Sequence, residues 1–369
     1  MYDYLVVGAG LAGATLAERL ANELEARVLV IDKREHLAGN CYDPLTEDGL
    51  RYHRYGPHIF HTNSQAVVAY LSRFTAWRPY EHRVLARVRG SLVPIPINRT
   101  TINALYGLEL DAAGTAAFLA ARALPAARIA NSEDAIVSRV GRELYELFFR
   151  DYTRKQWGLD PAQLDASVCG RIPTRTSDDD RYFTDAFQAM PADGYAAMVE
   201  RMLANPRIEL ALGVDYREAA DRVTFERIIF TGPIDEFFDY RYGRLPYRSL
   251  RFEFETLATE RAQPAACINE PAAGVPYTRT TEFKYLTGQS HPKTIVSREY
   301  PSAQGEPYYP IPMPESRALY ERYRRLAARE RHVTFAGRLA EYRYYNMDQV
   351  VASALATFAE LAGPSEVAS

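Results

Sequence analysis

The sequence predicts an α/β protein in which a discontinuous Rossmann-like domain carries an inserted helical domain and an antiparallel β-sheet domain. Three observations lead to this prediction. A glycine-rich turn stands between two apolar segments at the start of the chain, residues 101–152 have the apolar spacing of helices, and four strand-like segments without intervening helices lie within residues 250–299. Strand and helix alternate again after residue 333. The Rossmann-like domain is therefore expected to be assembled from separate parts of the chain.

The glycine turn is the first element of this prediction. Its sequence, Val-Val-Gly-Ala-Gly-Leu-Ala-Gly, is a G-x-G-x-x-G motif. Gly8 permits the tight turn, Gly10 lets backbone N–H groups approach a pyrophosphate, and Gly13 lets helix and strand pack closely. Asp32 is placed to accept a hydrogen bond from a ribose hydroxyl. The flanking segments complete a βαβ unit for a dinucleotide: strand 2–7, helix 14–25 and strand 27–31.

The other elements follow in chain order. Further strands are expected at 83–89, 91–97, 208–212, 223–231, 250–257, 265–269, 281–286, 294–299 and 333–335. Helices are expected at 112–124, 134–140, 142–149, 194–203 and 347–361, and a loop at 160–180. Pro94 and Pro96 place their strand at the edge or end of a sheet, and the strands at 208 and 223 are expected to join the first sheet.

These elements give expected domain boundaries. The dinucleotide-binding domain takes residues 1–72, 186–235 and 330–369, and the helical domain takes 98–165. The antiparallel sheet and substrate domain takes 73–97, 166–185 and 236–329, with a mobile loop near 165–178.

Composition excludes several classes of function. The chain has 369 residues and a net charge of −3, which gives no argument for nucleic acid or an anionic membrane as a partner. Three scattered cysteines form no C-x-x-C, so no disulfide framework and no zinc site is expected. The first strand begins at Tyr2, which leaves no room for a signal peptide, and no apolar run could span a bilayer. We expect a cytoplasmic protein without a metal.

Two further glycine turns are candidates for cofactor contacts. Gly39-Asn40 follows the βαβ unit, and Gly56-Pro57 is followed by His58 and His61. A cofactor-facing loop is the preferred interpretation of the two histidines. Zinc ligation lacks a third ligand, and surface histidines remain an alternative.

Aromatic and cationic side chains are candidates for binding a nucleotide. Residues 148–157 combine aromatic rings with cations at the end of a helix, which suits a base and a phosphate. Arg171, Arg175 and Arg279 offer planar forks to a diphosphate. Tyrosine clusters occupy 308–309 and 342–345, the second just before the last predicted helix. Aromatic packing and solvated surface charge are the alternatives for all of these residues.

No Gly-x-Ser-x-Gly, P-loop or H-E-x-x-H motif occurs in the sequence, so the chemistry is expected to be that of a cofactor. An NAD dehydrogenase usually keeps its dinucleotide domain in one piece. A domain interrupted by two insertions is more typical of a protein that buries FAD between its domains, which favours FAD.

Together these segments resemble UDP-galactopyranose mutase of the prokaryotic type, over nearly the whole chain. The resemblance implies FAD that is active when reduced, and the interconversion of UDP-galactopyranose and UDP-galactofuranose. It implies that the reduced flavin N5 attacks the anomeric carbon, that UDP leaves, and that a flavin–iminium sugar intermediate recloses through another hydroxyl. It also implies an external reductant such as NAD(P)H, a homo-oligomer and a role in supplying the cell envelope.

The resemblance also implies roles for individual residues. The catalytic residues would be Arg171, Arg279 and His58, with the two arginines clamping the diphosphate. Tyr152 would stack on uracil, and the other substrate-binding residues would be Phe148, Phe149, Thr153, Trp157, Tyr182, Asn269, Tyr308, Tyr309 and Tyr344. The cofactor would contact Gly8, Gly10, Gly13, Asp32, Gly39, Asn40, His58, His61, Arg338, Asn346, Met347 and Asp348. Many family members have aspartate where this chain has Asn346, and we expect this position to tune binding or flavin electronics.

Two other functions compete with this one. A flavin amine oxidase or desaturase shares the N-terminal motif and the split layout, but it would need an apolar tunnel. A binding protein for FAD or a nucleotide-sugar would need no particular redox state of the flavin.

Overall fold

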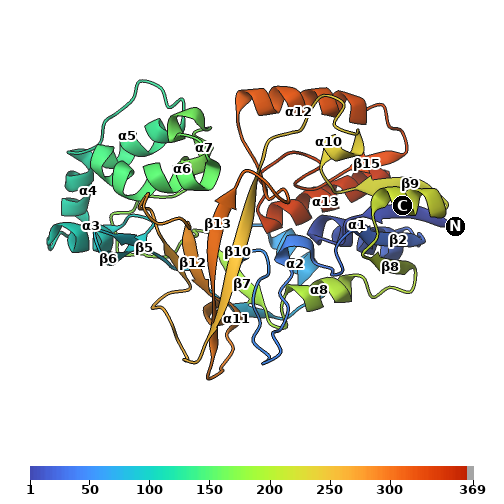
Figure 1. Ribbon diagram of the computed structural model, residues 1–369, viewed down its shortest axis with the longest axis horizontal. Helices are drawn as coiled ribbons and strands as arrows, with labels where there is room; N and C mark the ends of the chain where they lie inside the picture. Colours follow the sequence, from blue (N-terminus) through green and yellow to red (C-terminus); the bar gives the residue numbers. More distant parts are fainter. Residues whose placement is uncertain (364–369) are drawn as a thin grey trace, which may run out of the picture.

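The computed structural model describes residues 1–363 and contains three sheets with helices around them (Figure 1). A five-stranded parallel sheet has the order β15-β9-β1-β2-β8. Its strands are β1 (Tyr2–Val7), β2 (Val28–Asp32), β8 (Ile208–Leu212), β9 (Phe225–Phe230) and β15 (Val333–Phe335). The predicted strands at 208, 223 and 333 are therefore confirmed as members of the first sheet.

The core of this unit consists of apolar residues that recur at the spacing of a strand in the sheet and at the spacing of a helix in the helices. β1 and β2 bury Leu5, Val6 and Val30, which contribute nothing to the exposed surface. Helix α1 (Leu11–Glu23) begins directly after the glycine turn and packs against the C-terminal helix α13 (Met347–Ala362). Helix α8 (Tyr195–Met202) packs on α1 as well, and short helices α2 (Gln65–Leu71), α9 (Tyr216–Arg222), α10 (Ile234–Phe237) and η1 (Gly39–Cys41) complete this unit.

A seven-stranded sheet has the order β14-β10-β13-β12-β11-β5-β6. Its strands are β5 (Val84–Val88), β6 (Ser91–Ile95), β10 (Tyr247–Leu257), β11 (Cys267–Asn269), β12 (Arg279–Glu282), β13 (Thr294–Ser302) and β14 (Tyr309–Pro310). Strand β6 lies at the edge, as its prolines predict. All pairs are antiparallel except β11 with β5, which is parallel.

One predicted strand is wrong in its second half. Residues 281–286 were expected to be one strand, but the strand ends at Glu282 and helix α11 (Phe283–Thr287) follows. Phe283 and Leu286 are both fully buried at helical spacing, and Gly288 ends the helix in the left-handed conformation. Most of residues 160–180 is loop, as predicted, and the segment also contains the 3₁₀ turn η3 (Pro161–Gln163), capped by Asp160, and helix α7 (Ser167–Gly170), which buries Cys169.

The helical unit lies at the left of Figure 1 and packs on the β5–β6 end of the larger sheet. It consists of α3 (Arg99–Tyr106), α4 (Ala112–Ala120), α5 (Ser132–Tyr145), the π-helical turn η2 (Glu146–Arg150) and α6 (Asp151–Trp157). The predicted interruption at Gly141 is confirmed, since this residue has φ 82° inside α5. An added Cβ there would approach the Arg122 carbonyl oxygen to 2.3 Å.

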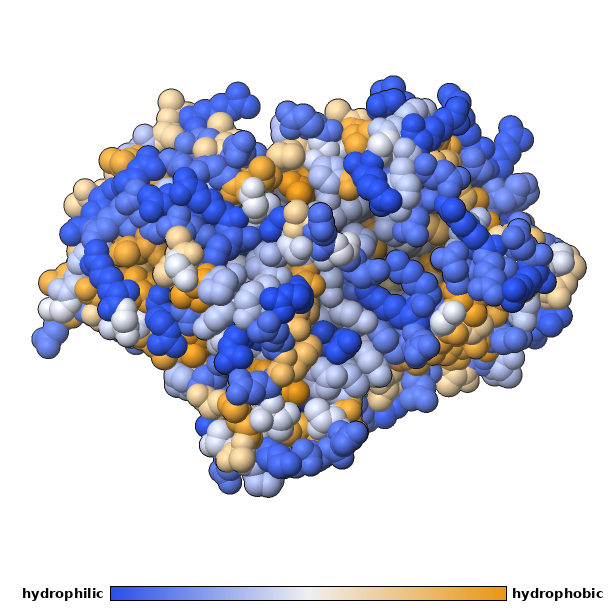
Figure 2. Space-filling view, viewed as in Figure 1, coloured by the Kyte–Doolittle hydropathy of each residue, from blue (hydrophilic) through white to orange (hydrophobic). Residues whose placement is uncertain are grey.

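A small third sheet was not predicted. It has the order β3-β7-β4 and joins β3 (Phe60–Thr62), β7 (Phe187–Pro191) and β4 (Trp77–Pro79). Helix α12 (Pro314–Ala327) also falls in a region expected to be sheet, and its outer face is strongly hydrophilic at the top of Figure 2. The predicted segment 330–369 extends past the described residues at its last six positions. Within residues 1–363, no helix has the length and apolar character needed to cross a membrane.

Candidate active site

The site is a cavity of about 590 Å³ where the parallel sheet, the larger antiparallel sheet and the segment after α7 meet. We define two parts of its lining. The glycine wall consists of Gly8, Gly10, Asp32, Gly39 and Asn40, and the arginine wall consists of Arg171, Arg279, Arg338, Tyr309 and Tyr344. Other predicted site residues on the lining are His58, His61, Tyr182, Asn269, Asn346 and Met347.

The glycine wall is built from backbone. A Cβ at Gly13 would lie 1.9 Å from the Gly8 carbonyl oxygen, and one at Gly39 would lie 3.0 Å from the Gly10 Cα, so these chain segments touch without side chains. Helix α1 has no side-chain cap, which leaves its first N–H groups free to bind an anion at the cavity. Asp32 accepts hydrogen bonds of 2.9 Å from the backbone N–H of Ala9 and of Arg34. Each carboxylate oxygen keeps a lone pair for a ribose hydroxyl.

The two predicted histidines have different surroundings. His58 borders the cavity with protein on every other side, and its backbone N–H donates to His53 Nδ1 at 3.0 Å. Burial lowers the pKa of His58 to about 4, and the nearby charge of Arg338 lowers the pKa as well. The hydrogen bond with the Gly56 carbonyl acts in the opposite direction and raises the pKa. The imidazole is therefore neutral at neutral pH. His61 pairs with Asp185 at 2.8 Å and stacks on Phe183.

The arginine wall is held together by aromatic rings and one carboxylate. Arg279 Nη2 donates to the Tyr152 hydroxyl at 2.8 Å, and its Nε lies 3.6 Å from Glu299. The Arg171 guanidinium lies 4.9 Å from the centre of the Tyr344 ring. Arg338 lies 4.9 Å from the Tyr309 ring centre and 5.1 Å from that of Tyr344.

Charges in this wall change the ionisation of its tyrosines. Tyr344 lines the cavity and keeps 36% of its surface exposed. Burial there raises the pKa of Tyr344, but Arg171 and Arg338 outweigh it and bring the pKa below its usual value. Burial and the nearby Glu299 raise the pKa of Tyr309. The three arginines therefore give the wall a strong positive charge. Among the described residues, Glu299 is the carboxylate that pairs with one of these arginines, Arg279.

Several polar atoms on the cavity lining have no hydrogen-bond partner in the described part of the chain. They are Arg279 Nε, Arg338 Nε, Arg338 Nη2 and Asn269 Oδ1. Buried donors without partners are costly, so three free guanidinium donors at one cavity indicate a site for an anion. A phosphate group suits the arginine fork.

Some predicted site residues lie behind the lining. Phe148 and Phe149 are buried in the core of the helical unit, and Thr153 is buried against Cys169. Trp157 is buried with its ring centre 6.1 Å from those of Tyr309 and Tyr344. Tyr152 reaches the wall through its bond to Arg279.

The remaining three have packing contacts. Tyr308 is buried between Tyr55 and Phe252, Gly13 packs α1 on β1, and Asp348 accepts a hydrogen bond from Thr62 at 2.8 Å.

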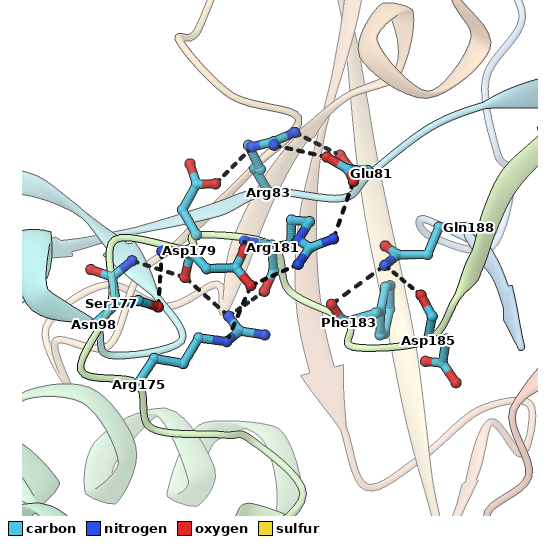
Figure 3. A network of polar contacts seen from close by, with 11 residues as sticks. Glu81, Arg83, Asn98, Arg175, Ser177, Asp179, Arg181, Phe183, Asp185 and Gln188 are labelled. Carbon is cyan, nitrogen blue, oxygen red and sulfur yellow. Dashed lines mark hydrogen bonds and ion pairs between the residues drawn. The ribbon is translucent and has the colours of Figure 1, made fainter. Parts of the chain in front are cut away.

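Arg175 anchors the segment that follows Arg171 (Figure 3). Its guanidinium donates to the carbonyl oxygens of Asp179 and Arg181, and its backbone N–H donates to the Ile97 carbonyl at 2.9 Å. Arg181 pairs in turn with Asp179 and with Glu81. Arg175 is thus not on the cavity lining, and the segment is fixed on one side of Arg171.

Some lining residues were not predicted. His82, Phe183, Glu299 and Glu306 border the cavity. Burial lowers the pKa of His82 to about 3, with Arg279 adding to the effect. Glu299 could have been found only from strand register, because it pairs with Arg279 across β12 and β13. Glu306 forms ion pairs with Lys33 at 3.3 Å and Arg34 at 3.7 Å.

Comparison with known proteins identifies the family. A family model described as UDP-galactopyranose mutase matches residues 147–344, more than half of the chain. A probable UDP-galactopyranose mutase of Klebsiella pneumoniae is 40% identical over 369 aligned positions, which cover 96% of this chain and 93% of that protein. The chain belongs to the UDP-galactopyranose mutase family. A model of an NAD(P)-binding Rossmann-like domain also matches residues 6–74.

Other members of the UDP-galactopyranose mutase family differ in substrate. A dTDP-fucopyranose mutase of Escherichia coli is 36% identical over 366 positions, covering 96% of this chain and 97% of its own. A crystal structure of reduced UDP-galactopyranose mutase has the same fold, with a TM-score of 0.77 at 17% identity, over 98% of this chain and 94% of that one. The protein is thus an isomerase of this family, a pyranose/furanose mutase of nucleotide sugars with a dinucleotide-binding Rossmann-like domain.

Proposed function

We propose that this protein interconverts UDP-galactopyranose and UDP-galactofuranose with FAD bound at the glycine wall. The observation that carries the proposal is the meeting of two anion sites in one cavity. One is the backbone cradle of Gly8, Gly10 and Gly39, and the other is the set of guanidinium donors without partners. A flavin dinucleotide and a nucleotide-sugar diphosphate together need two such sites.

The glycine wall fits the FAD pyrophosphate and adenosine. The uncapped start of α1 faces the pyrophosphate, and Asp32 takes the ribose hydroxyl. His58 stays neutral beside the cofactor, and Met347 begins helix α13 at the cavity. When reduced, the bound flavin supplies N5 as the nucleophile for the anomeric carbon.

Arg171 and Arg279 bind the diphosphate of the substrate. The bond between the sugar and UDP breaks with charge building on the diphosphate, so both guanidiniums interact more strongly as UDP departs. They then hold UDP for its return to the sugar. Tyr344, between Arg171 and Arg338, contacts the same diphosphate through its hydroxyl.

The base and the sugar are bound by side chains next to this wall. Tyr152, whose hydroxyl accepts the hydrogen bond from Arg279, offers the ring for uracil. Tyr182 and Asn269 line the cavity and contact the sugar hydroxyls.

Turnover of two furanose substrates tests the proposal. The purified protein is given UDP-galactofuranose or dTDP-fucofuranose, with its flavin oxidised or reduced by dithionite, and the products are separated by chromatography. The proposal expects UDP-galactopyranose from the reduced protein alone, at a kcat/KM at least tenfold above that for the dTDP sugar. Preference for dTDP-fucofuranose would assign the substrate of the E. coli relative instead, and no turnover in either redox state would contradict mutase activity.

A further inference from the structure

The ammonium group of Lys155 lies among four carbonyl oxygens of one loop. On α6, Lys155 Nζ donates to the carbonyls of residues 270, 272, 275 and 277 at 2.5, 3.0, 2.9 and 3.0 Å. An ammonium has three N–H donors, so the four oxygens share them. Burial lowers the pKa of Lys155 to about 8, while Glu270 and Asp151 oppose the shift. The group is therefore charged at neutral pH.

The loop that Lys155 holds connects two residues of the cavity. Asn269 ends β11 and Arg279 begins β12, and the two are partners across the ladder. Both line the cavity, and both carry a buried polar atom that forms no hydrogen bond with residues 1–363. The conformation of residues 270–278 therefore sets where these two side chains stand.

The loop has backbone hydrogen bonds of its own, from Glu270 N–H to the Thr278 carbonyl at 2.8 Å and from Val275 N–H to the Ala272 carbonyl at 3.2 Å, and Lys155 ties it to α6. Prolines at 271 and 276 remove two N–H donors, and Gly274 has open space around it. Without the ammonium, four carbonyl dipoles, three of them partly buried and one exposed, would converge on a site with no protein donor. The loop would then open or turn away from α6.

Helix α6 reaches the same hairpin a second time. Tyr152, one turn before Lys155, accepts the hydrogen bond from Arg279 at 2.8 Å. One helix thus holds both the loop and the arginine that follows it.

We propose that Lys155 is a positioning residue for diphosphate recognition: its ammonium fixes the loop between β11 and β12 and thereby aims Arg279 and Asn269 at the nucleotide-sugar. Lys155 itself does not touch the substrate. The proposal rests on the proposed role of Arg279 in binding the diphosphate.

Three variants of the flavin-loaded protein test it, with UDP as the probe. Lys155→Met keeps the length of the side chain and removes the charge, and Lys155→Arg keeps the charge with a different shape. Arg154→Met is the matched control, because Arg154 is the neighbouring cation, pairs with Asp151 and Asp160, and does not contact the loop. UDP dissociation constants and hydrogen exchange of the 270–278 amides are measured for each.

We expect Lys155→Met to weaken UDP binding about tenfold or more, as loss of hydrogen bonds to a charged group implies, and to speed exchange of the loop amides. The UDP affinity of Lys155→Arg should lie between those of wild type and Lys155→Met, and the UDP affinity of Arg154→Met should match that of wild type. Wild-type UDP affinity in Lys155→Met would overturn the proposal, whether or not the loop exchanges faster.

Chemical rescue keeps the test independent of folding defects. Lys155→Ala removes the side chain beyond Cβ, so n-propylammonium can restore a cation among the four oxygens. We expect the added amine to restore UDP binding to Lys155→Ala and to leave Arg279→Ala unrestored. Failure of rescue in a folded Lys155→Ala protein would overturn the proposal. Because UDP binding needs no turnover, absence of mutase activity in the wild type would contradict the proposed function and leave this test intact.

Discussion

The glycine wall and the arginine wall enclose one cavity but are built in opposite ways. The glycine wall comes from residues 8–40, the βαβ unit and the turn that follows it, and binds mainly through backbone groups, with the Asp32 carboxylate added. The arginine wall comes from the segment after α7, β12, β14 and the segment before α13, and binds through side chains. Changes in the first wall should act on folding and cofactor retention, and changes in the second should act on substrate binding and turnover. Four predictions test this division.

Gly13→Ala should have the largest effect. Its Cβ would lie 1.9 Å from the Gly8 carbonyl oxygen, and neither the helix nor the strand can move away cheaply. We expect a protein purified without flavin absorbance and destabilised by about 4 kcal/mol or more, measured by denaturant unfolding. Gly274→Ala is the control, because a Cβ added there would meet no atom within 4 Å, and this variant should keep its flavin. Full flavin content in Gly13→Ala would contradict the close packing.

Arg279→Lys and Arg171→Lys should each lower kcat/KM for UDP-galactofuranose about 100-fold or more while flavin content stays normal. Lysine keeps the charge but not the planar fork, and the lost contacts are those that strengthen as UDP leaves. The control is Arg298→Lys, an exposed arginine on β13 paired with Glu255. Loss of flavin from the Arg279 variant would break the division between the walls.

Tyr344→Phe should change the pH dependence of the affinity for UDP by about tenfold. Because its pKa lies below the usual value near 10, Tyr344 ionises as the pH rises toward 10, and its phenolate then repels the diphosphate between Arg171 and Arg338. Wild-type affinity for UDP should therefore fall as the pH rises toward 10, and the fall should be about tenfold smaller in Tyr344→Phe, since ionisation of the uracil ring affects both proteins alike. Tyr300→Phe, on the exposed face of β13, should keep the wild-type profile. An unchanged profile in Tyr344→Phe would assign the fall to another group.

Asn346→Asp should have the smallest effect. Asn346 is the N-cap residue of α13, a position where a carboxylate is also favourable, and its backbone N–H already donates to the Gln349 side chain at 2.9 Å. We expect turnover within tenfold of wild type, measured with reduced protein. An increase above tenfold would mean that a carboxylate at this position takes part in proton transfer.

The same division explains what could be predicted from the sequence. The glycine wall is local, so the spacing of Gly8, Gly10 and Gly13 after an apolar strand was enough to predict it. The partner of Arg279 depends on which residue of β13 lies opposite, and Glu299 was missed for that reason. The segment 281–286 fits both a strand and a helix period, and only the burial of Phe283 and Leu286 selects the helix.

A crystal structure of the flavin-loaded protein with UDP would show whether the two walls bind different ligands. We predict the FAD pyrophosphate against Gly8 and Gly10, and the UDP diphosphate within hydrogen-bond distance of the Arg171 and Arg279 guanidiniums. UDP bound at the glycine wall, or a diphosphate that touches neither arginine, would contradict this prediction.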